Sequence, residues 1–167
     1  MLSIDLRNKK ILFFSPSAFG YECSVKRRLQ ELGAIVTYYD DRPSNNFWSK
    51  AMLRCFKRSM LLVIDSYYRE IYKELDNCNY FDYIFLLNLE AMPLWFLKKL
   101  RIKYNCCPII LYMWDSFKNK VHTKDYFDFC DRIISFDYED HKHNPRLEFR
   151  PLFFLNEYSS IAEKKGF

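Results

Sequence analysis

The amino-acid sequence predicts an α/β fold, a Rossmann-like three-layer sandwich with a mostly parallel sheet of about six strands. Short apolar runs alternate with longer amphipathic runs, as they do in repeated strand–helix–strand units. The short runs are apolar on both faces, which is typical of buried parallel strands. The chain has 167 residues, so one domain is expected at residues 1–158, with a C-terminal tail or linker at 159–167.

The predicted strands are short apolar segments. The first covers residues 10–15, where the sequence reads KILFFS after a basic start, and a turn with proline and glycine follows it. The same kind of run occurs five more times along the chain. These further strands are predicted at residues 34–39, 82–88, 108–114, 132–136 and 147–150.

Between the strands, apolar residues recur at helical spacing. Residues 21–32 are expected to form a helix because Val25, Leu29 and Leu32 share one face, and Gly33 follows as its stop. The long segment before the third strand is expected to hold two helices or one broken helix. The further helices are predicted at residues 46–77, 93–104, 123–130 and 137–144.

Composition excludes several classes of protein. Half of the residues are hydrophobic and 28% are charged, which excludes an intrinsically disordered chain. The net charge of +5 is mild and spread along the chain, so no nucleic-acid partner is expected. The six cysteines form no CxxC motif, and free thiols in a reducing cytoplasm are favoured over a disulfide framework. No signal peptide or membrane-spanning segment is predicted, so the expected location is the cytoplasm.

Several motifs are missing where this fold would use them. A dinucleotide site needs GxGxxG after the first strand, but this loop reads SPSAFG at residues 15–20, with one of the chain's three glycines. A P-loop is excluded for the same reason, and no GxSxG nucleophile motif occurs. His141 and His143 form an HxH pair, but their charged neighbours favour a solvated helix end over a metal site. No cofactor and no metal is expected in this domain.

The candidate functional residues follow the predicted strands. In open α/β sheets, ligands bind at the carboxyl ends of the strands, which meet along one edge. Taken singly, each acid there is better explained by helix capping or solvation, and it is their convergence that favours a site. The residues expected at this edge are Ser15, Ser17, Gly20, Tyr21, Asp40, Asp41, Arg42, Asn88, Glu90, Trp114, Asp115, Ser116, Asp137, Glu139 and Asp140.

A second distinctive feature is the run NFWSKAMLRCFKRSML at residues 46–61. On a helix, Arg54 and Arg58 would follow one strip, with Trp48 and Phe56 on another. An interfacial membrane helix has this pattern, but so does a helix that packs its apolar face on a sheet and leaves its basic residues in water. Packing on the sheet is favoured. Peripheral contact with an anionic membrane, on the inner face of the cell membrane, is the alternative.

Four motifs together resemble a known family. They are KILFFSPSAFGY at residues 10–21, DDRPS at 40–44, LYMWDS at 111–116 and FDYED at 136–140. In order and spacing they resemble glycosyltransferases of GT-B architecture from bacterial lipopolysaccharide and capsule clusters, related to the CgeB-like spore-maturation group. The resemblance covers about residues 9–158.

The resemblance implies a two-domain enzyme, in which two Rossmann-like domains face each other across a cleft. The N-terminal domain of the family binds the acceptor, here a glycan or a lipid-linked glycan, and the C-terminal domain binds the nucleotide-sugar donor. This chain resembles the N-terminal domain, so a donor-binding domain or subunit is expected in trans and a complete active site is not. Two other interpretations stay open: a non-catalytic Rossmann-like binding or scaffold module, and a truncated, inactive remnant.

Sugar transfer of the kind that the resemblance implies needs a base near the acceptor hydroxyl. Asp115 and Glu90 are the candidates, because both follow central strands. Arg42 is expected to hold an acceptor phosphate or carboxylate, and Tyr21 and Trp114 are expected to stack on a sugar ring. The remaining predicted substrate-binding residues are Ser17, Asp41 and Asp137.

Overall fold

The computed structural model of the chain describes residues 5–43 and 57–153. Its centre is a six-stranded sheet in which every neighbouring pair of strands runs parallel. The predicted Rossmann-like α/β fold is confirmed, and the described sheet is wholly parallel rather than mostly parallel. The strands are β1 (Lys10–Ser15), β2 (Ile35–Asp40), β3 (Tyr83–Leu87), β4 (Ile109–Met113), β5 (Arg132–Ser135) and β6 (Leu147–Phe149).

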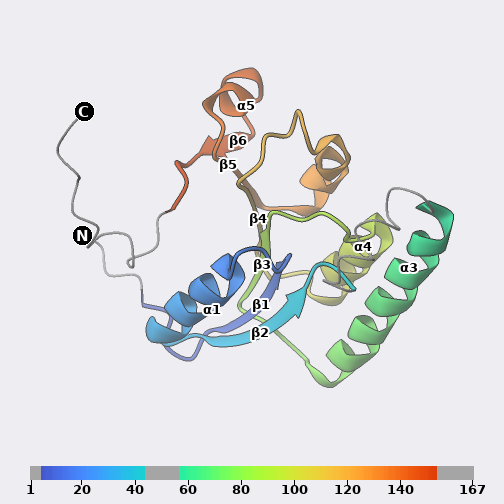
Figure 1. Ribbon diagram of the computed structural model, residues 1–167. Helices are drawn as coiled ribbons and strands as arrows, with labels where there is room; N and C mark the ends of the chain where they lie inside the picture. Colours follow the sequence, from blue (N-terminus) through green and yellow to red (C-terminus); the bar gives the residue numbers. More distant parts are fainter. Residues whose placement is uncertain (1–4, 44–56, 154–167) are drawn as a thin grey trace.

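Helices lie on both sides of this sheet, and Figure 1 shows α1 on one side with α3 and α4 on the other. The predicted helix at residues 46–77 corresponds, over its described part, to α3 and the 3-10 turn η1, while residues 44–56 lie outside the described part of the chain. The helical elements are α1 (Tyr21–Glu31), α3 (Lys57–Glu74), η1 (Leu75–Asn77), α4 (Leu94–Lys103), the 3-10 helix η2 (Val121–Phe129) and α5 (Tyr138–His143).

The connection from α1 to β2 depends on Gly33. Its φ is +93°, in the left-handed region that glycine adopts without strain. A Cβ atom at this position would lie 2.8 Å from Cα of Arg7, so a larger residue would require the backbone to move. The N–H of Gly33 donates to the carbonyl of Gln30 at 2.9 Å, which closes the end of the helix. The helix stop predicted at Gly33 therefore has a steric basis.

The larger hydrophobic core lies between the sheet and helices α3 and α4. Phe14 of β1, Tyr68 of α3 and Phe96 of α4 are fully buried and meet there. The ring centroid of Phe96 is 5.6 Å from that of Phe14 and 4.7 Å from that of Tyr68. The core under α1 is smaller and is bordered by half-buried aromatic side chains of β3 and β4. The two faces of the sheet are therefore covered unequally.

The strand order β2-β1-β3-β4-β5-β6 determines where a ligand can approach the sheet. The strand β2 pairs with one edge of β1. The chain then crosses over to form β3, which pairs with the opposite edge of β1. The loops that follow β1 and β3 therefore leave the sheet in opposite directions. Parallel α/β sheets bind ligands in the crevice outside such a switch point. The candidate site is accordingly sought at the carboxyl ends of β1, β3 and β4.

Replacing Phe96 by Ala tests the larger core. The variant leaves a cavity among aromatic rings, so we expect the free energy of unfolding to fall by about 3–5 kcal/mol. Urea unfolding followed by circular dichroism measures this loss. Ile102 lies on the same helix but is 78% exposed, and Ile102→Ala is the matched control. The control should change stability by less than about 0.5 kcal/mol. Equal losses in the two variants would contradict the described packing.

Candidate functional site

The loop between β1 and α1 is held by a carboxylate of the protein itself. Glu22, in the first turn of α1, is 5% exposed. Its carboxylate accepts hydrogen bonds from the hydroxyl of Ser17 and from the backbone N–H of Ala18, both at 3.0 Å. The backbone N–H of Ser17 donates to Asp40 at the end of β2, at 3.3 Å. The predicted substrate-binding residue Ser17 is therefore engaged in fixing the loop.

These contacts favour the ionised form of Glu22 at the start of α1. Burial alone would raise the pKa of Glu22, but hydrogen bonds from the N–H groups of Ala18 and Glu22 and from the hydroxyl of Ser17 outweigh it and hold the pKa below its ordinary value. A phosphate bound here would have to displace a carboxylate that already takes the donors of the loop and benefits from the helix dipole. The β1–α1 loop is therefore poorly suited to a nucleotide diphosphate.

Asp41, which follows β2, is fully buried. Its carboxylate accepts hydrogen bonds from the backbone N–H groups of Glu90 (2.5 Å), Ala91 (2.8 Å) and Met92 (3.0 Å) and from the hydroxyl of Tyr68 (2.7 Å). Burial raises the pKa of Asp41, and the hydrogen bonds from Glu90, Tyr68 and Ala91 oppose the rise. A side chain enclosed in this way does not reach a ligand. The contacts of Asp41 thus support the loop that follows β3, a role different from the substrate binding that the sequence predicts.

Arg42 and Glu90 meet at the crevice between the ends of β1 and β3. Nη1 of Arg42 lies 3.6 Å from Oε2 of Glu90, and Nη2 of Arg42 donates to the carbonyl of Ser17. Nζ of Lys120 lies 3.0 Å from Oε1 of Glu90. Glu90 is thus paired with two cations. Of the two predicted bases, it is the one whose charge is already balanced by cations of the protein.

Tyr21 and Trp114, which the sequence placed at the same edge, are in contact. Their ring centroids are 5.9 Å apart in an edge-to-face arrangement, and Phe153 lies 6.1 Å from Tyr21 and 6.0 Å from Trp114. Phe19 extends the group, 6.0 Å from Tyr21. We refer to Phe19, Tyr21, Trp114 and Phe153 as the aromatic cluster. Three of its members are half-buried and Phe19 is exposed, so the cluster presents ring surface to solvent.

Asp115 follows Trp114 directly, on the loop beyond β4. Among the described residues, Asp115 accepts one hydrogen bond, from Nδ2 of Asn119 at 3.0 Å. A carboxylate can accept about four hydrogen bonds, so this half-buried side chain keeps acceptor capacity for a substrate hydroxyl. Its surroundings fit the predicted role of base better than those of Glu90.

Asp137 has a structural role at the start of α5. Its carboxylate accepts a hydrogen bond from the N–H of Glu139 at 2.9 Å, as a helix cap does. It also lines a polar hollow of about 530 Å³ beside that helix. The nearby Asp140 accepts hydrogen bonds from the hydroxyls of Ser116 (3.3 Å) and Ser135 (2.9 Å). Asp140 therefore ties the loop that carries the candidate base to β5.

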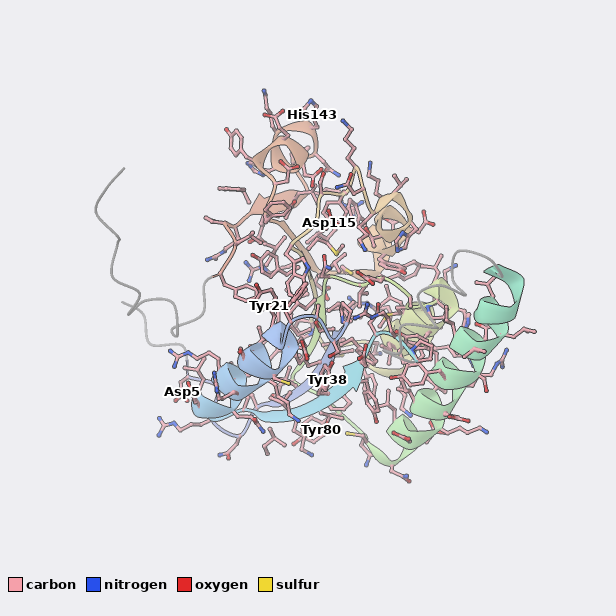
Figure 2. All side chains as sticks on the ribbon, viewed as in Figure 1. Asp5, Tyr21, Tyr38, Tyr80, Asp115 and His143 are labelled. Carbon is pink, nitrogen blue, oxygen red and sulfur yellow. The ribbon has the colours of Figure 1, made fainter. Side chains whose placement is uncertain are left out.

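The two histidines of the HxH pair have separate partners. Nδ1 of His141 lies 2.5 Å from the carbonyl oxygen of Leu147, and Nδ1 of His143 lies 2.7 Å from that of Glu139. Figure 2 shows His143 on α5, away from both Tyr21 and Asp115. Over residues 5–43 and 57–153, no group of His, Cys, Asp and Glu side chains has the arrangement of a metal site.

A cavity of about 380 Å³ lies between α1 and the aromatic face of β3 and β4. Val25 and Leu29 of α1 line it from one side, and Phe85 and Tyr112 of the strands line it from the other. Phe153 belongs both to this lining and to the aromatic cluster. The volume falls in the usual range for small-molecule pockets, about 300–1,000 Å³. The aromatic cluster therefore adjoins a concave surface whose apolar side chains are bordered by Ser24, Arg27, Arg28 and Glu31 of α1.

Most of the basic and aromatic strip predicted at residues 46–61 lies outside the described residues. In the described part of α3, Ile64 and Tyr68 pack toward the sheet, while Leu61 and Leu62 are 61% and 73% exposed. Within the described ranges, no helix is both long enough and apolar enough to cross a bilayer.

Sequence patterns did not reveal three residues of this region: Glu22, Lys120 and Phe153. An acid in the first turn of a helix usually interacts with the helix dipole from the surface, and Glu22 is buried because the preceding loop folds back over it. Lys120 lies in a loop, and Phe153 follows the last strand, where no periodicity marks its position. The roles of Lys120 and Phe153 arise from contacts between segments that are distant in the sequence, whereas that of Glu22 arises from the fold of the loop directly before it.

Comparison with known proteins does not place the chain in a family. No protein-family model matches the sequence, and no curated protein matches it significantly. The function is therefore inferred from the geometry of the site together with the resemblance of the four motifs.

Replacing Glu22 by Gln tests the clamp on the β1–α1 loop. Because the folded-state pKa of Glu22 is lowered, its ionised form adds stability above the ordinary pKa, and this stability is lost as the pH falls through the folded-state pKa. We expect the variant to lose about 1–2 kcal/mol at pH 7, with the difference from the parent shrinking toward pH 3. Urea unfolding at both pH values measures this.

The matched control for the clamp is Glu31→Gln at the other end of α1. Glu31 pairs with Arg28 at 3.1 Å on the exposed surface, so its loss should cost less than about 0.5 kcal/mol. A difference between parent and Glu22→Gln that stayed constant with pH would show that the carboxylate charge does not stabilise the loop.

Proposed function

We propose that this chain is the acceptor-binding domain of a glycosyltransferase for bacterial surface polysaccharide, such as lipopolysaccharide or capsule. One observation carries the proposal: Tyr21 and Trp114, from distant parts of the chain, meet at the carboxyl edge of the sheet beside Asp115. A sugar ring has apolar C–H faces and a rim of hydroxyls. Aromatic rings next to a carboxylate with free acceptor capacity match both properties. The resemblance of the four motifs supports the same class of enzyme.

In the proposed reaction, a hydroxyl of the acceptor attacks the anomeric carbon of a nucleotide sugar. The bond from that carbon to the diphosphate breaks, and the proton of the hydroxyl passes to a base. We assign the base to Asp115, because Glu90 is engaged by Arg42 and Lys120. In this proposal Glu90 orients the two cations, which attract a phosphate or carboxylate group of the acceptor.

The nucleotide-sugar donor is assigned to a separate domain or subunit. A diphosphate is usually held by N–H donors at the start of a helix. In the β1–α1 loop, the N–H of Ala18 and the hydroxyl of Ser17 already donate to Glu22. If the acceptor is lipid-linked, the cavity next to Phe153 offers an apolar surface for its lipid part.

Replacing Trp114 by Ala tests the proposal. We expect glycan binding to weaken by about tenfold or more, because a half-buried aromatic contact is lost. The probes are the core oligosaccharide released from lipopolysaccharide and a set of capsular oligosaccharides, titrated into the full chain by calorimetry. Trp95→Phe is the matched control, since Trp95 lies on α4 at the opposite face, where its Nε1 donates to Asp65 at 2.7 Å.

The same titrations with UDP-glucose and GDP-mannose separate the alternatives. Tight binding of a nucleotide sugar would contradict the assignment of the donor to another domain. If the parent protein bound none of the oligosaccharides, the proposed function would be overturned. Glycan binding without sugar transfer, in the presence of a donor-binding domain, would favour the alternative of a non-catalytic binding module.

A further inference from the structure

Phe19, at the tip of the β1–α1 loop, is unfavourably placed in two respects. Its side chain is 95% exposed. Its φ is +56°, in the left-handed region, which bulky residues rarely adopt because the Cβ atom approaches the carbonyl oxygen. The other described non-glycine residues with positive φ are Asn8 and Asn88, and asparagine tolerates this region. Among these three, the conformation is most costly at Phe19.

Contacts on both sides of Phe19 hold the loop in this conformation. On one side, the N–H of Ala18 donates to Glu22 at 3.0 Å, and the carbonyl of Ala18 accepts from the N–H of Tyr21 at 3.1 Å. On the other side, Gly20 is also left-handed, with φ of +77°, and leads directly into α1. Phe19 therefore cannot relax without breaking the clamp. Strain maintained in this way is typical of positions where function requires the conformation.

Burial within the described residues does not compensate for the strain. The ring of Phe19 contacts Tyr21, with 6.0 Å between centroids, and is otherwise open to solvent. A glycine would adopt the same backbone conformation freely. The property that phenylalanine adds at this position is an exposed aromatic face, carried by a clamped backbone at the carboxyl edge of the sheet and next to Tyr21 of the aromatic cluster.

We propose that Phe19 binds the acceptor directly, by stacking its ring on the apolar face of a sugar. This inference rests on the proposed function, because the ligand is the same glycan. Tyr21, Trp114 and Phe153 are half-buried, whereas Phe19 has nearly its whole ring available. Because hydrogen bonds on both sides of Phe19 already fix its backbone, little backbone entropy is lost there on binding, which favours affinity. Phe19 thus forms the outer part of the surface whose inner part is Trp114.

Two substitutions test whether the ring of Phe19 serves binding rather than stability. Phe19→Gly removes both the ring and the backbone strain, so we expect an unchanged or higher Tm together with about tenfold weaker binding of the lipopolysaccharide core oligosaccharide. Phe19→Tyr keeps both, so it should bind the oligosaccharide within about threefold of the parent. Thermal unfolding and calorimetric titration of the full chain measure the two properties independently.

The outcomes distinguish this proposal from the proposed function. If Trp114→Ala loses binding while Phe19→Gly binds like the parent, the role of Phe19 is overturned and the proposed function stands. A Tm for Phe19→Gly clearly below that of the parent would show that the ring stabilises the fold, and would also count against a ligand-binding role. If the parent protein binds no oligosaccharide, both proposals fall together. If Phe19→Gly instead abolishes co-purification of a protein partner while glycan binding persists, the surface serves that partner and the sugar assignment is wrong.

Discussion

The carboxylate of Asp41 lies at the end of β2, enclosed beneath α3, and accepts hydrogen bonds from the hydroxyl of Tyr68 and from consecutive N–H groups of the loop that begins at Glu90. A carboxylate is costly to bury unless donors replace the water it loses, and here four donors do so. The same bonds satisfy three consecutive backbone N–H groups of the loop that precedes α4. The crevice between β1 and β3 is therefore held in one arrangement.

The candidate site depends on this arrangement through a continuous series of contacts. The backbone N–H of Glu90 is fixed by the buried carboxylate, and its side chain pairs with Arg42. Arg42 donates to the carbonyl of Ser17, and the hydroxyl of Ser17 donates to Glu22. Glu22 in turn holds the residue before Phe19. A polar network thus extends from the buried Asp41 to the loop that carries the exposed ring of Phe19. The main role of its residues is to hold the site in position.

The unequal coverage of the sheet separates stability from binding. On the side of α3 and α4, large side chains are fully buried, and that core provides most of the apolar burial. On the side of α1, the aromatic residues of β3 and β4 stay half-buried and border a cavity. The aromatic cluster lies where this less covered side meets the carboxyl edge. Substitutions in the cluster should therefore affect ligand binding more than folding, whereas those in the larger core should do the reverse.

The order of strands and helices was determined by the sequence, because each element depends on local patterns. The run KILFFS is apolar on both faces and predicts a buried strand, and Gly33 ends the helix that follows. The sequence could also predict that Tyr21 and Trp114 lie close together, because the carboxyl ends of parallel strands share one edge. That argument needs the sheet to be parallel and does not need any side-chain contact.

Only the tertiary structure decided which polar residues are open to a ligand. Asp41 and Asp115 look alike in the sequence, since both are acids within two residues of the end of a predicted strand. One is enclosed by four donors and the other has one amide partner. The difference comes from Tyr68 and from the loop after β3, which are distant along the chain. Likewise, Phe19 has a strained backbone and an exposed ring because hydrogen bonds to Glu22 hold its loop in one conformation. Burial at Asp41 depends on contacts between distant segments, and strain at Phe19 depends on how its loop folds, so the order of residue types alone encodes neither.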